Sequence, residues 1–289
     1  MAVPATSAPA PPVVAGQALS RRRRARWSGF WLLGAILVIA LIGPEVLTDY
    51  DPEKADPVNA LLSPSSAHPF GTNNNGADVF SRVLHAARLD IFIGFASVAI
   101  AFAIATPLGA AVGYSRRWWA GAVMRFMDFL QSFPIFVLAM AFVAFAGTSM
   151  RNVIIVLAVL FVPIFVRVVR SEVLALREAT FIEAARCVGN SDRRIVLRHI
   201  LPNVLGTALA QASINIGWAL LVVAGISFVG AGLQPPTPEW GLMIGEGAEN
   251  IITGEWWIAL FPGLALGVTV LAFALAGDAV RDKLDVRLR

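Results

Sequence analysis

Six long apolar runs constrain the fold of this chain more than any other feature of its sequence. Each run has about 17–26 residues, enough for an α-helix to cross a hydrocarbon core roughly 30 Å thick. Of the 289 residues, 57% are hydrophobic and 15% are charged, whereas soluble domains carry about 25% charged residues. The sequence therefore predicts an all-α membrane protein with six transmembrane helices. Their approximate limits are residues 27–47, 89–112, 129–146, 153–169, 204–229 and 257–276.

The distribution of Lys and Arg predicts the orientation of the chain. With the N-terminus inside, the inner segments are residues 1–28, 114–125, 167–203 and 277–289. They hold all 23 basic residues except Lys54, Arg82, Arg88 and Arg151. Because cytoplasmic segments are enriched in Lys and Arg, we expect both termini in the cytoplasm.

The first apolar run is predicted to be an uncleaved transmembrane helix. It is too long for the apolar region of a signal peptide, and no small-residue cleavage site follows it. Residues 1–20 are rich in Ala, Pro and Ser without helical periodicity, which is typical of disorder. The predicted units are a disordered basic cytoplasmic tail (1–26), a first transmembrane helix (27–47), an external segment (48–88), a five-helix transmembrane core (89–276) with an external loop (230–256), and a cytoplasmic tail (277–289).

A polar interruption between the fourth and fifth runs is predicted to form a short cytoplasmic helix. Thr180 followed three residues later by Glu183 fits a capping box, which marks a helix start. Apolar residues then recur at helical spacing, so we expect an exposed apolar ridge on this helix. The residues of this predicted ridge are Phe181, Ile182, Ala185 and Val188.

A turn and a second short helix are predicted next. Gly189 can adopt the left-handed conformation that ends a helix, residues 190–192 offer caps, and Pro202 limits the second helix. The result is a helix–turn–helix elbow over residues 180–202. Its ridge fits a groove in a partner protein, and an amphipathic loop lying on lipid headgroups fits equally well.

Polar residues within the apolar runs are candidates for a translocation pathway. Thr207, Gln211 and Asn215 recur on one helix face, and such a stripe lines a cavity or forms hydrogen bonds between helices. Asp128, Gln131 and Ser132 are expected near the cytoplasmic end of the third run, where an exposed interface position is favoured over a place in the pathway.

The sequence offers little for catalysis or metal binding. The three His residues are scattered, and the single Cys187 has no partner for a disulfide, metal or redox role, so we expect it to serve in packing. No Gly-rich loop precedes Lys-Ser or Lys-Thr, so we expect no nucleotide site on this chain. Since the Arg residues follow the membrane topology, we expect no nucleic-acid partner. We predict no catalytic residues and no metal site.

The elbow resembles the coupling motif of membrane subunits in binding-protein-dependent ABC importers. The family often has Ile three residues before the motif's Pro, where this sequence has His199. The matching residues are Glu183-Ala184-Ala185, Gly189 and Leu201-Pro202.

Three further segments resemble one group of these importers, namely the second membrane subunit of dipeptide/oligopeptide permeases. The resemblance covers roughly residues 27–289, although Val286 stands where the group usually has Pro. The segments are His68 to Thr72, Ser227 to Gly230 leading into Gln234 to Pro238, and Gly277 to Asp285.

This resemblance implies a type I ABC importer permease (MetI-like) architecture in a prokaryotic plasma (inner) membrane. It implies a second homologous permease subunit, with which this chain forms a heterodimer around the pathway. Cytoplasmic ABC ATPase subunits would bind ATP and Mg, while this chain would bind no cofactor. An external peptide-binding protein would deliver di- or oligopeptides.

The resemblance also implies which residues transmit motion from the ATPase. The implied ATPase-coupling residues are Phe181, Ile182, Glu183, Ala184, Ala185, Arg186, Val188, Gly189 and Pro202. Alternatives remain open at this point: the same machinery with a nickel chelate, haem or a sugar as cargo, a secondary transporter without an ATPase, or a membrane-embedded enzyme.

Overall fold

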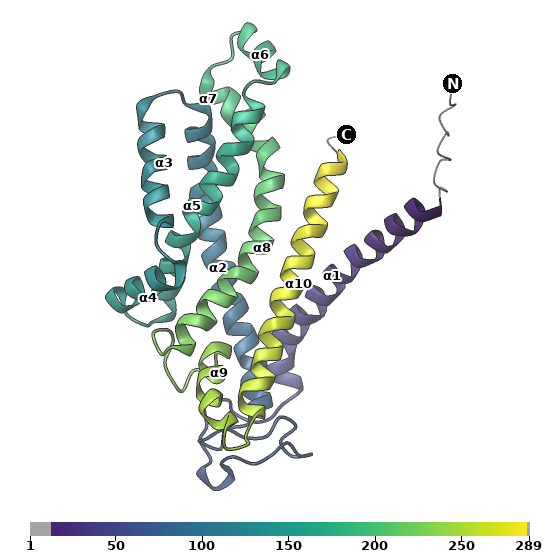
Figure 1. The fold of residues 1–289 in the computed structure, drawn as a ribbon, viewed down its shortest axis with the longest axis vertical. Helices are drawn as coiled ribbons and strands as arrows, with labels where there is room; N and C mark the ends of the chain where they lie inside the picture. Colours follow the sequence, from purple (N-terminus) through teal and green to yellow (C-terminus); the bar gives the residue numbers. More distant parts are fainter. Residues whose placement is uncertain (1–12, 288–289) are drawn as a thin grey trace, which may run out of the picture.

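The protein is a bundle of long helices that run in a common direction (Figure 1). The computed structural model describes residues 13–287. Apart from one isolated bridge between Thr72 and Asp78, its regular structure is helical. The helices are α1 (Val13–Val46), η1 (Pro57–Asn59), α2 (Val79–Tyr114), α3 (Trp118–Gln131), α4 (Ile135–Ala146), α5 (Met150–Leu176), α6 (Thr180–Cys187), α7 (Asp192–Ile195), η2 (Val196–Ile200), α8 (Leu201–Phe228), α9 (Trp240–Ala248), η3 (Glu249–Ile251) and α10 (Trp257–Arg287).

The number of membrane spans agrees with the sequence. Five helical segments of the described chain are long and apolar enough to cross a membrane, and the bent pair α3–α4 makes a sixth if it counts as one span. The predicted all-α fold with six spans is confirmed. The observed helices extend beyond the predicted limits because caps and polar turns continue them past the apolar residues. At the start of α2, for example, Asp78 accepts a hydrogen bond from the backbone N–H of Ser81 (2.7 Å).

The predicted third span, residues 129–146, is wrong as a single helix. It straddles a break between α3 and α4, whose axes differ by 92°. The break falls at Pro134, whose ring removes a backbone donor and disfavours helical geometry at the residue before it. The helix that ends at Gln131 instead begins at Trp118, in a segment that we had assigned to a cytoplasmic loop.

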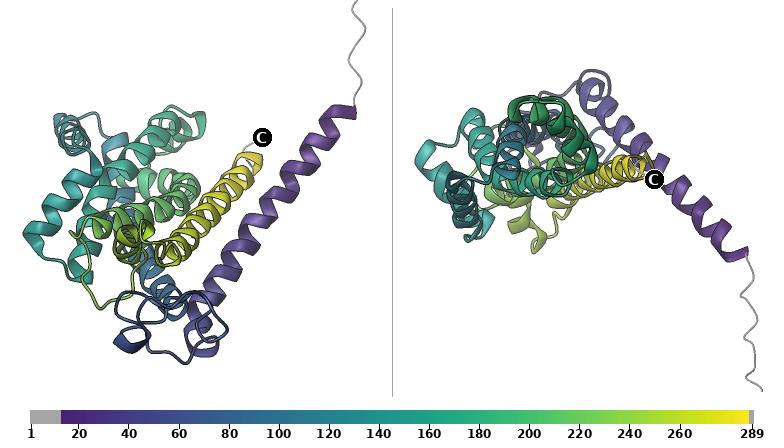
Figure 2. Two further views of the ribbon diagram at one scale, coloured as in Figure 1. Left: turned by 60° about the horizontal axis from the view of Figure 1, so that its bottom comes forward. Right: turned by 90° about the horizontal axis from the view of Figure 1, so that it is seen from above.

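The two ends of the chain also differ from the prediction. Helix α1 begins at Val13, so residues 13–26 of the predicted disordered tail are helical, while residues 1–12 lie outside the described residues. Helix α10 continues to Arg287 through most of the predicted C-terminal tail. Figure 2 shows that α1 projects away from the bundle at its N-terminal end. Farther along, Gly29 packs against Leu275 of α10.

The second short helix of the elbow is not a separate element. Helices α7, η2 and α8 form one continuous segment, Asp192–Phe228. Pro202 does not end it, because Pro202 lies in the first turn of α8, directly after the π-helical turn η2. A change from π-helical to α-helical pairing is a place where a missing N–H is tolerated.

Helices α2 and α5 pack closely against each other at two glycines of α2. A Cβ atom on Gly109 would lie 2.9 Å from Cβ of Val169, and one on Gly113 would lie 2.8 Å from Cβ of Val173. Since real Cβ atoms do not approach so closely, only glycine lets these two helices pack as they do. Helices α2 and α5, with α8 and α10, also supply most of the buried apolar core.

The end of the bundle opposite α6 is a folded cap built from residues 47–78 and α9 (Figure 1). Arg82 at the start of α2 donates to the carbonyls of Pro52 (2.9 Å) and Pro236 (3.2 Å), joining the two loops. Glu239 caps α9 by accepting from the N–H groups of Gly241 and Leu242. Burial raises the pKa of the Glu239 carboxyl, although these two hydrogen bonds oppose the rise.

Candidate functional site

Helix α6 lies at the far end of the molecule, beyond the bundle (Figure 1). Its N-terminal cap is Ala179, and no side chain caps the helix, so the predicted capping box of Thr180 and Glu183 is wrong. The helix starts one residue earlier than that pattern indicated. The N–H of Glu183 therefore pairs with the carbonyl of Ala179 (3.3 Å) rather than with the Thr180 side chain.

The end of α6 is a tightly bonded turn. Gly189 has φ +82°, the left-handed conformation that the sequence predicted. The N–H of Gly189 donates to the carbonyl of Arg186 (2.9 Å), and the N–H of Asn190 donates to that of Ala185 (3.2 Å). The Asn190 side chain donates to the same Ala185 carbonyl (3.1 Å). This pattern is a Schellman motif, which satisfies the last carbonyls of a helix and fixes the direction of the chain beyond it.

The predicted apolar ridge divides between two faces of α6. Phe181 and Val188 are exposed, by 45% and 79% respectively. Ile182 and Ala185 are buried, and they pack in an apolar cluster with Val173 and other residues of α5, α7 and α8. The prediction that all four side chains are exposed is wrong because the chain itself covers half of the ridge. One face of α6 remains exposed, while its opposite face packs on the bundle.

The other predicted coupling residues lie on the exposed side of the elbow. The side chains of Glu183, Ala184 and Arg186 are exposed, as are Gly189 and Pro202. Cys187, for which we expected a packing role, is also exposed, so that expectation is wrong. The exposed face of α6 therefore combines two apolar side chains with charges of both signs.

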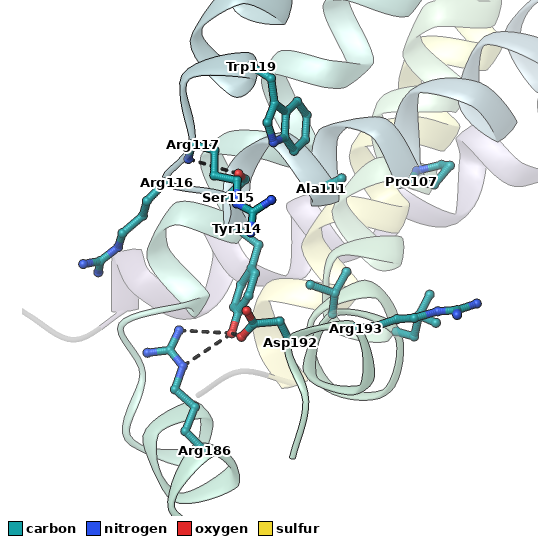
Figure 3. A pocket seen from close by; sticks show the side chains of 12 residues that line it. Pro107, Ala111, Tyr114, Ser115, Arg116, Arg117, Trp119, Arg186, Asp192 and Arg193 are labelled. Atoms are coloured by element: carbon teal, nitrogen blue, oxygen red, sulfur yellow. Dashed lines mark hydrogen bonds between the residues drawn. The ribbon is translucent and has the colours of Figure 1, made fainter. Parts of the chain in front are cut away.

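A hydrogen-bonded cluster connects α6 to the end of α2 (Figure 3). The hydroxyl of Tyr114 donates to Oδ1 of Asp192 (2.7 Å) and accepts from Nη2 of Arg186 (3.2 Å). The Arg186 guanidinium also lies 5.5 Å from the centre of the Tyr114 ring. The cluster borders a hollow of about 780 Å³ between α2, α3 and α7. The cluster therefore connects α6 to α2, in addition to its packing on α5 and α8.

A second polar contact holds the segment that leads into α6. Glu178 pairs with Arg177 (2.9 Å) and with Arg116, which lies just before α3 (3.1 Å). Desolvation opposes ionisation of Glu178, but hydrogen bonds and charge from Arg177 and Arg116 lower its pKa below the ordinary value. Arg177 also donates to the carbonyl of Gly113 (3.2 Å), so the segment that leads into the elbow is likewise connected to α2.

The predicted polar stripe on α8 is partly inside the protein. Asn215 is 1% exposed, while Thr207 and Gln211 are half-buried. The Gln211 amide donates to Oδ1 of Asn215 (3.1 Å). At Asn215 this geometry favours hydrogen bonding within the protein over contact with an open cavity. Thr207 and Gln211 keep some exposure, which a pathway residue requires.

Sequence reasoning missed Tyr114 and read Asp192 only as a helix cap. The two residues lie 78 positions apart, so no local pattern could pair them. One signal was present: Tyr114 is one of only two Tyr residues, and it stands where an apolar run meets basic residues.

The chain is similar in sequence to known membrane transport proteins. A family model described as binding-protein-dependent transport system inner membrane component matches residues 105–289. The dipeptide transport system permease protein DppC of Alkalihalophilus pseudofirmus is 40% identical over 261 residues, covering 90% of this chain and 85% of that protein. The glutathione transport system permease protein GsiD of Escherichia coli is 40% identical over 280 residues, 92% of each chain.

A solved structure shares the fold. A chain of the MetNI methionine ABC transporter, solved in inward-facing conformations, aligns with a TM-score of 0.59 and 20% identity. The alignment covers 70% of this chain and 96% of that chain. The chain described here belongs to the family of binding-protein-dependent transport system inner membrane components, the multi-pass membrane subunits of ABC importers.

Proposed function

We propose that this chain forms half of the translocation pathway of an ATP-driven importer of di- and oligopeptides. Two relatives that are each 40% identical over most of the chain carry the names of a dipeptide permease and a permease for glutathione, which is itself a tripeptide. A second homologous permease subunit completes the pathway as a heterodimer. An external peptide-binding protein delivers the cargo to the cap formed by residues 47–78 and α9.

The α6 end of the bundle is proposed to face the cytoplasm. The segments at this end, including the described ends of α1 and α10, carry most of the Lys and Arg residues (Figure 1). Because basic residues are enriched on the cytoplasmic side, this placement puts both termini and the elbow inside the cell. The cap at the opposite end then faces the binding protein.

The observation that carries the proposal is the structure of the elbow. Phe181 and Val188 are exposed on a short helix whose opposite side, Ile182 and Ala185, is locked into the bundle. A helix of this kind fits a groove in another protein. The protein that provides this groove is a cytoplasmic ABC ATPase, which binds ATP and Mg in place of this chain. If two ATPase states bind α6 differently, they shift the equilibrium between inward-open and outward-open bundles.

The route of the cargo is proposed to follow α8. Thr207 and Gln211 present polar groups at membrane depth, where such groups face protein or water rather than lipid. Asn215, which is buried here, would join the stripe when α8 moves relative to its neighbours. Pairing with the second subunit would close the pathway on its other side.

The proposal is tested by reconstituting the chain in liposomes with its genomic neighbours. ATP inside the vesicles and binding protein outside are expected to drive accumulation of a labelled dipeptide. Accumulation driven by an ion gradient without any ATPase would establish a secondary transporter instead. ATP-driven accumulation of a nickel chelate, haem or a sugar, but of no peptide, would support an ATP-driven importer and refute peptides as its cargo.

Removal of the Tyr114 hydroxyl is expected to weaken coupling without loss of assembly. In Tyr114→Phe the ring remains over Arg186, but the hydrogen bonds to Asp192 and Arg186 are lost. At about 1 kcal/mol for such contacts, the ratio of peptide transported to ATP hydrolysed should fall roughly fivefold. Tyr50→Phe at the opposite end of the bundle is the control. An unchanged ratio in Tyr114→Phe would show that the Tyr114 hydroxyl takes no part in transmission.

A further inference from the structure

An ion pair joins α3 to α5 away from the elbow. Nη2 of Arg167 lies 2.6 Å from Oδ1 of Asp128. Both side chains are more than half exposed in the single chain, by 54% and 57% respectively. The pair therefore does not serve to fill the core of this subunit, and its exposure needs another explanation.

Both residues belong to helices that pass as membrane spans by length and composition, and they lie toward the α6 end of these helices. Asp128 lies one helical turn before the break that divides the bent span α3–α4. Arg167 lies nine residues before the end of α5 at Leu176, which is about 14 Å along a helix axis. Ionisable groups on membrane-spanning helices face the bundle interior or a water-filled cavity and avoid lipid. The exposure of this pair is therefore compatible with a water-filled pathway.

A cavity of about 370 Å³ adjoins the pair at the break between α3 and α4. Arg167 and Gln131 are its two lining residues with polar side chains, and within residues 13–287 the buried Oε1 of Gln131 has no hydrogen-bond partner. Apolar side chains from three helices make up the remaining wall, among them Phe133, Leu160 and Ile164. Pockets for small ligands start at about 300 Å³ and combine an apolar lining with a few polar groups in this way.

We infer that this cavity, together with the Asp128–Arg167 pair, is a subsite that holds a short peptide during its passage. Arg167 would bind the peptide's C-terminal carboxylate, Asp128 its N-terminal ammonium, and the apolar wall a side chain. The inference rests on the proposed peptide cargo and adds to it the residues that recognise the peptide's two charged ends.

The chemistry of the pair suits a transient site. A free dipeptide carries one positive and one negative end, so it can exchange partners with Asp128 and Arg167 without leaving any charge unpaired. When no peptide is present the two residues neutralise each other, which avoids the cost of an isolated charge at membrane depth. The charges are paired both with and without the peptide, so the net gain on binding is small. The peptide can therefore leave the subsite.

The test uses the complete transporter in liposomes and replaces the pair by apolar residues. Asp128→Leu/Arg167→Met retains a contact between α3 and α5, because well-packed apolar residues substitute for an ion pair at little cost in stability. We expect an unchanged melting temperature and unchanged ATPase assembly, with maximal dipeptide uptake about tenfold lower, as for the loss of one charge-assisted contact. The matched control is Arg170→Met, one turn farther along α5. Uptake by the double variant at the wild-type rate would overturn the inference.

A second measurement asks directly whether peptide occupies the cavity. A photoreactive amino acid in place of Leu160 is expected to label a radioactive dipeptide during ATP turnover, and the double variant should lose this labelling. Excess free dipeptide should compete, while the same dipeptide with both ends blocked should not. Equal competition by both would refute recognition of the charged ends. If the wild-type complex takes up no peptide at all, the proposed function fails; normal uptake without labelling refutes the subsite alone.

Discussion

A single acidic residue in place of Phe181 is expected to abolish ATP-driven uptake while leaving the chain folded. Phe181 is 45% exposed and lies in the first turn of α6, where a negative charge is favourable to the helix. The same charge in the apolar groove of a partner would be desolvated without a counter-ion, which costs several kcal/mol. We expect Phe181→Asp to lower uptake by about a hundredfold or more and to weaken retention of the ATPase during size-exclusion chromatography.

Two neighbouring substitutions make this result interpretable. Leu197→Asp places the same charge on an exposed apolar residue of η2, outside α6, and should retain most of the uptake. Ile182→Asp places the charge in the apolar cluster beneath α6, so this variant should lose folding stability as well as uptake. Normal ATPase retention and uptake in Phe181→Asp would show that α6 is not the docking helix and would favour a loop that lies on lipid headgroups.

Substitution of Gly113 by a larger residue is expected to destabilise the bundle more than the same substitution at any exposed glycine. A Cβ atom at this position would lie 2.8 Å from Cβ of Val173 and 3.1 Å from the carbonyl of Arg170. Because α5 backbone stands in the way, a rotamer change cannot relieve the clash. Overpacking of this kind costs about 1–3 kcal/mol, so Gly113→Val should lower the melting temperature by roughly 3–10 °C. Thermal unfolding of the purified chain in detergent measures the effect.

Gly267 provides the matched control for this prediction. It belongs to a second pair of glycines at the same spacing, Gly263 and Gly267, on α10. Apart from the adjacent residues and the backbone of α10 itself, no described atom lies within 4 Å of a Cβ position on either one. Gly267→Val should therefore melt close to the wild type. Equal melting temperatures for Gly113→Val and Gly267→Val would contradict the close packing of α2 on α5.

The contrast between the two glycine pairs illustrates what the sequence could and could not predict. Their spacing is identical, and only the tertiary structure distinguishes the pair that packs from the pair that does not. The same holds for α6, where periodicity found the apolar residues but could not tell Phe181, which is exposed, from its neighbour Ile182, which is buried. Burial depends on how α5, α7 and α8 surround the helix, and no local pattern contains that information.

Features that depend on local chemistry were predicted well. Gly189 has the left-handed conformation because few other residues adopt it at low cost, and apolar composition alone found most of the spans. The break between α3 and α4 was missed although Pro134 signals it, because the apolar run continues across the proline and was read as one helix. The Tyr114–Asp192 contact and the Asp128–Arg167 pair join distant segments, so they required the structure.

The most direct test of the account uses Cys187, the chain's single cysteine, which lies exposed on α6. A maleimide reagent should label it rapidly in the isolated subunit, and mass spectrometry of this subunit follows the reaction. In the complete transporter we expect labelling to slow by about tenfold or more, because the ATPase covers α6, and to change again when ATP is trapped in the ATPase. Equal labelling rates in the isolated chain, the complex and the ATP-trapped complex would contradict the claim that this elbow receives the work of ATP hydrolysis.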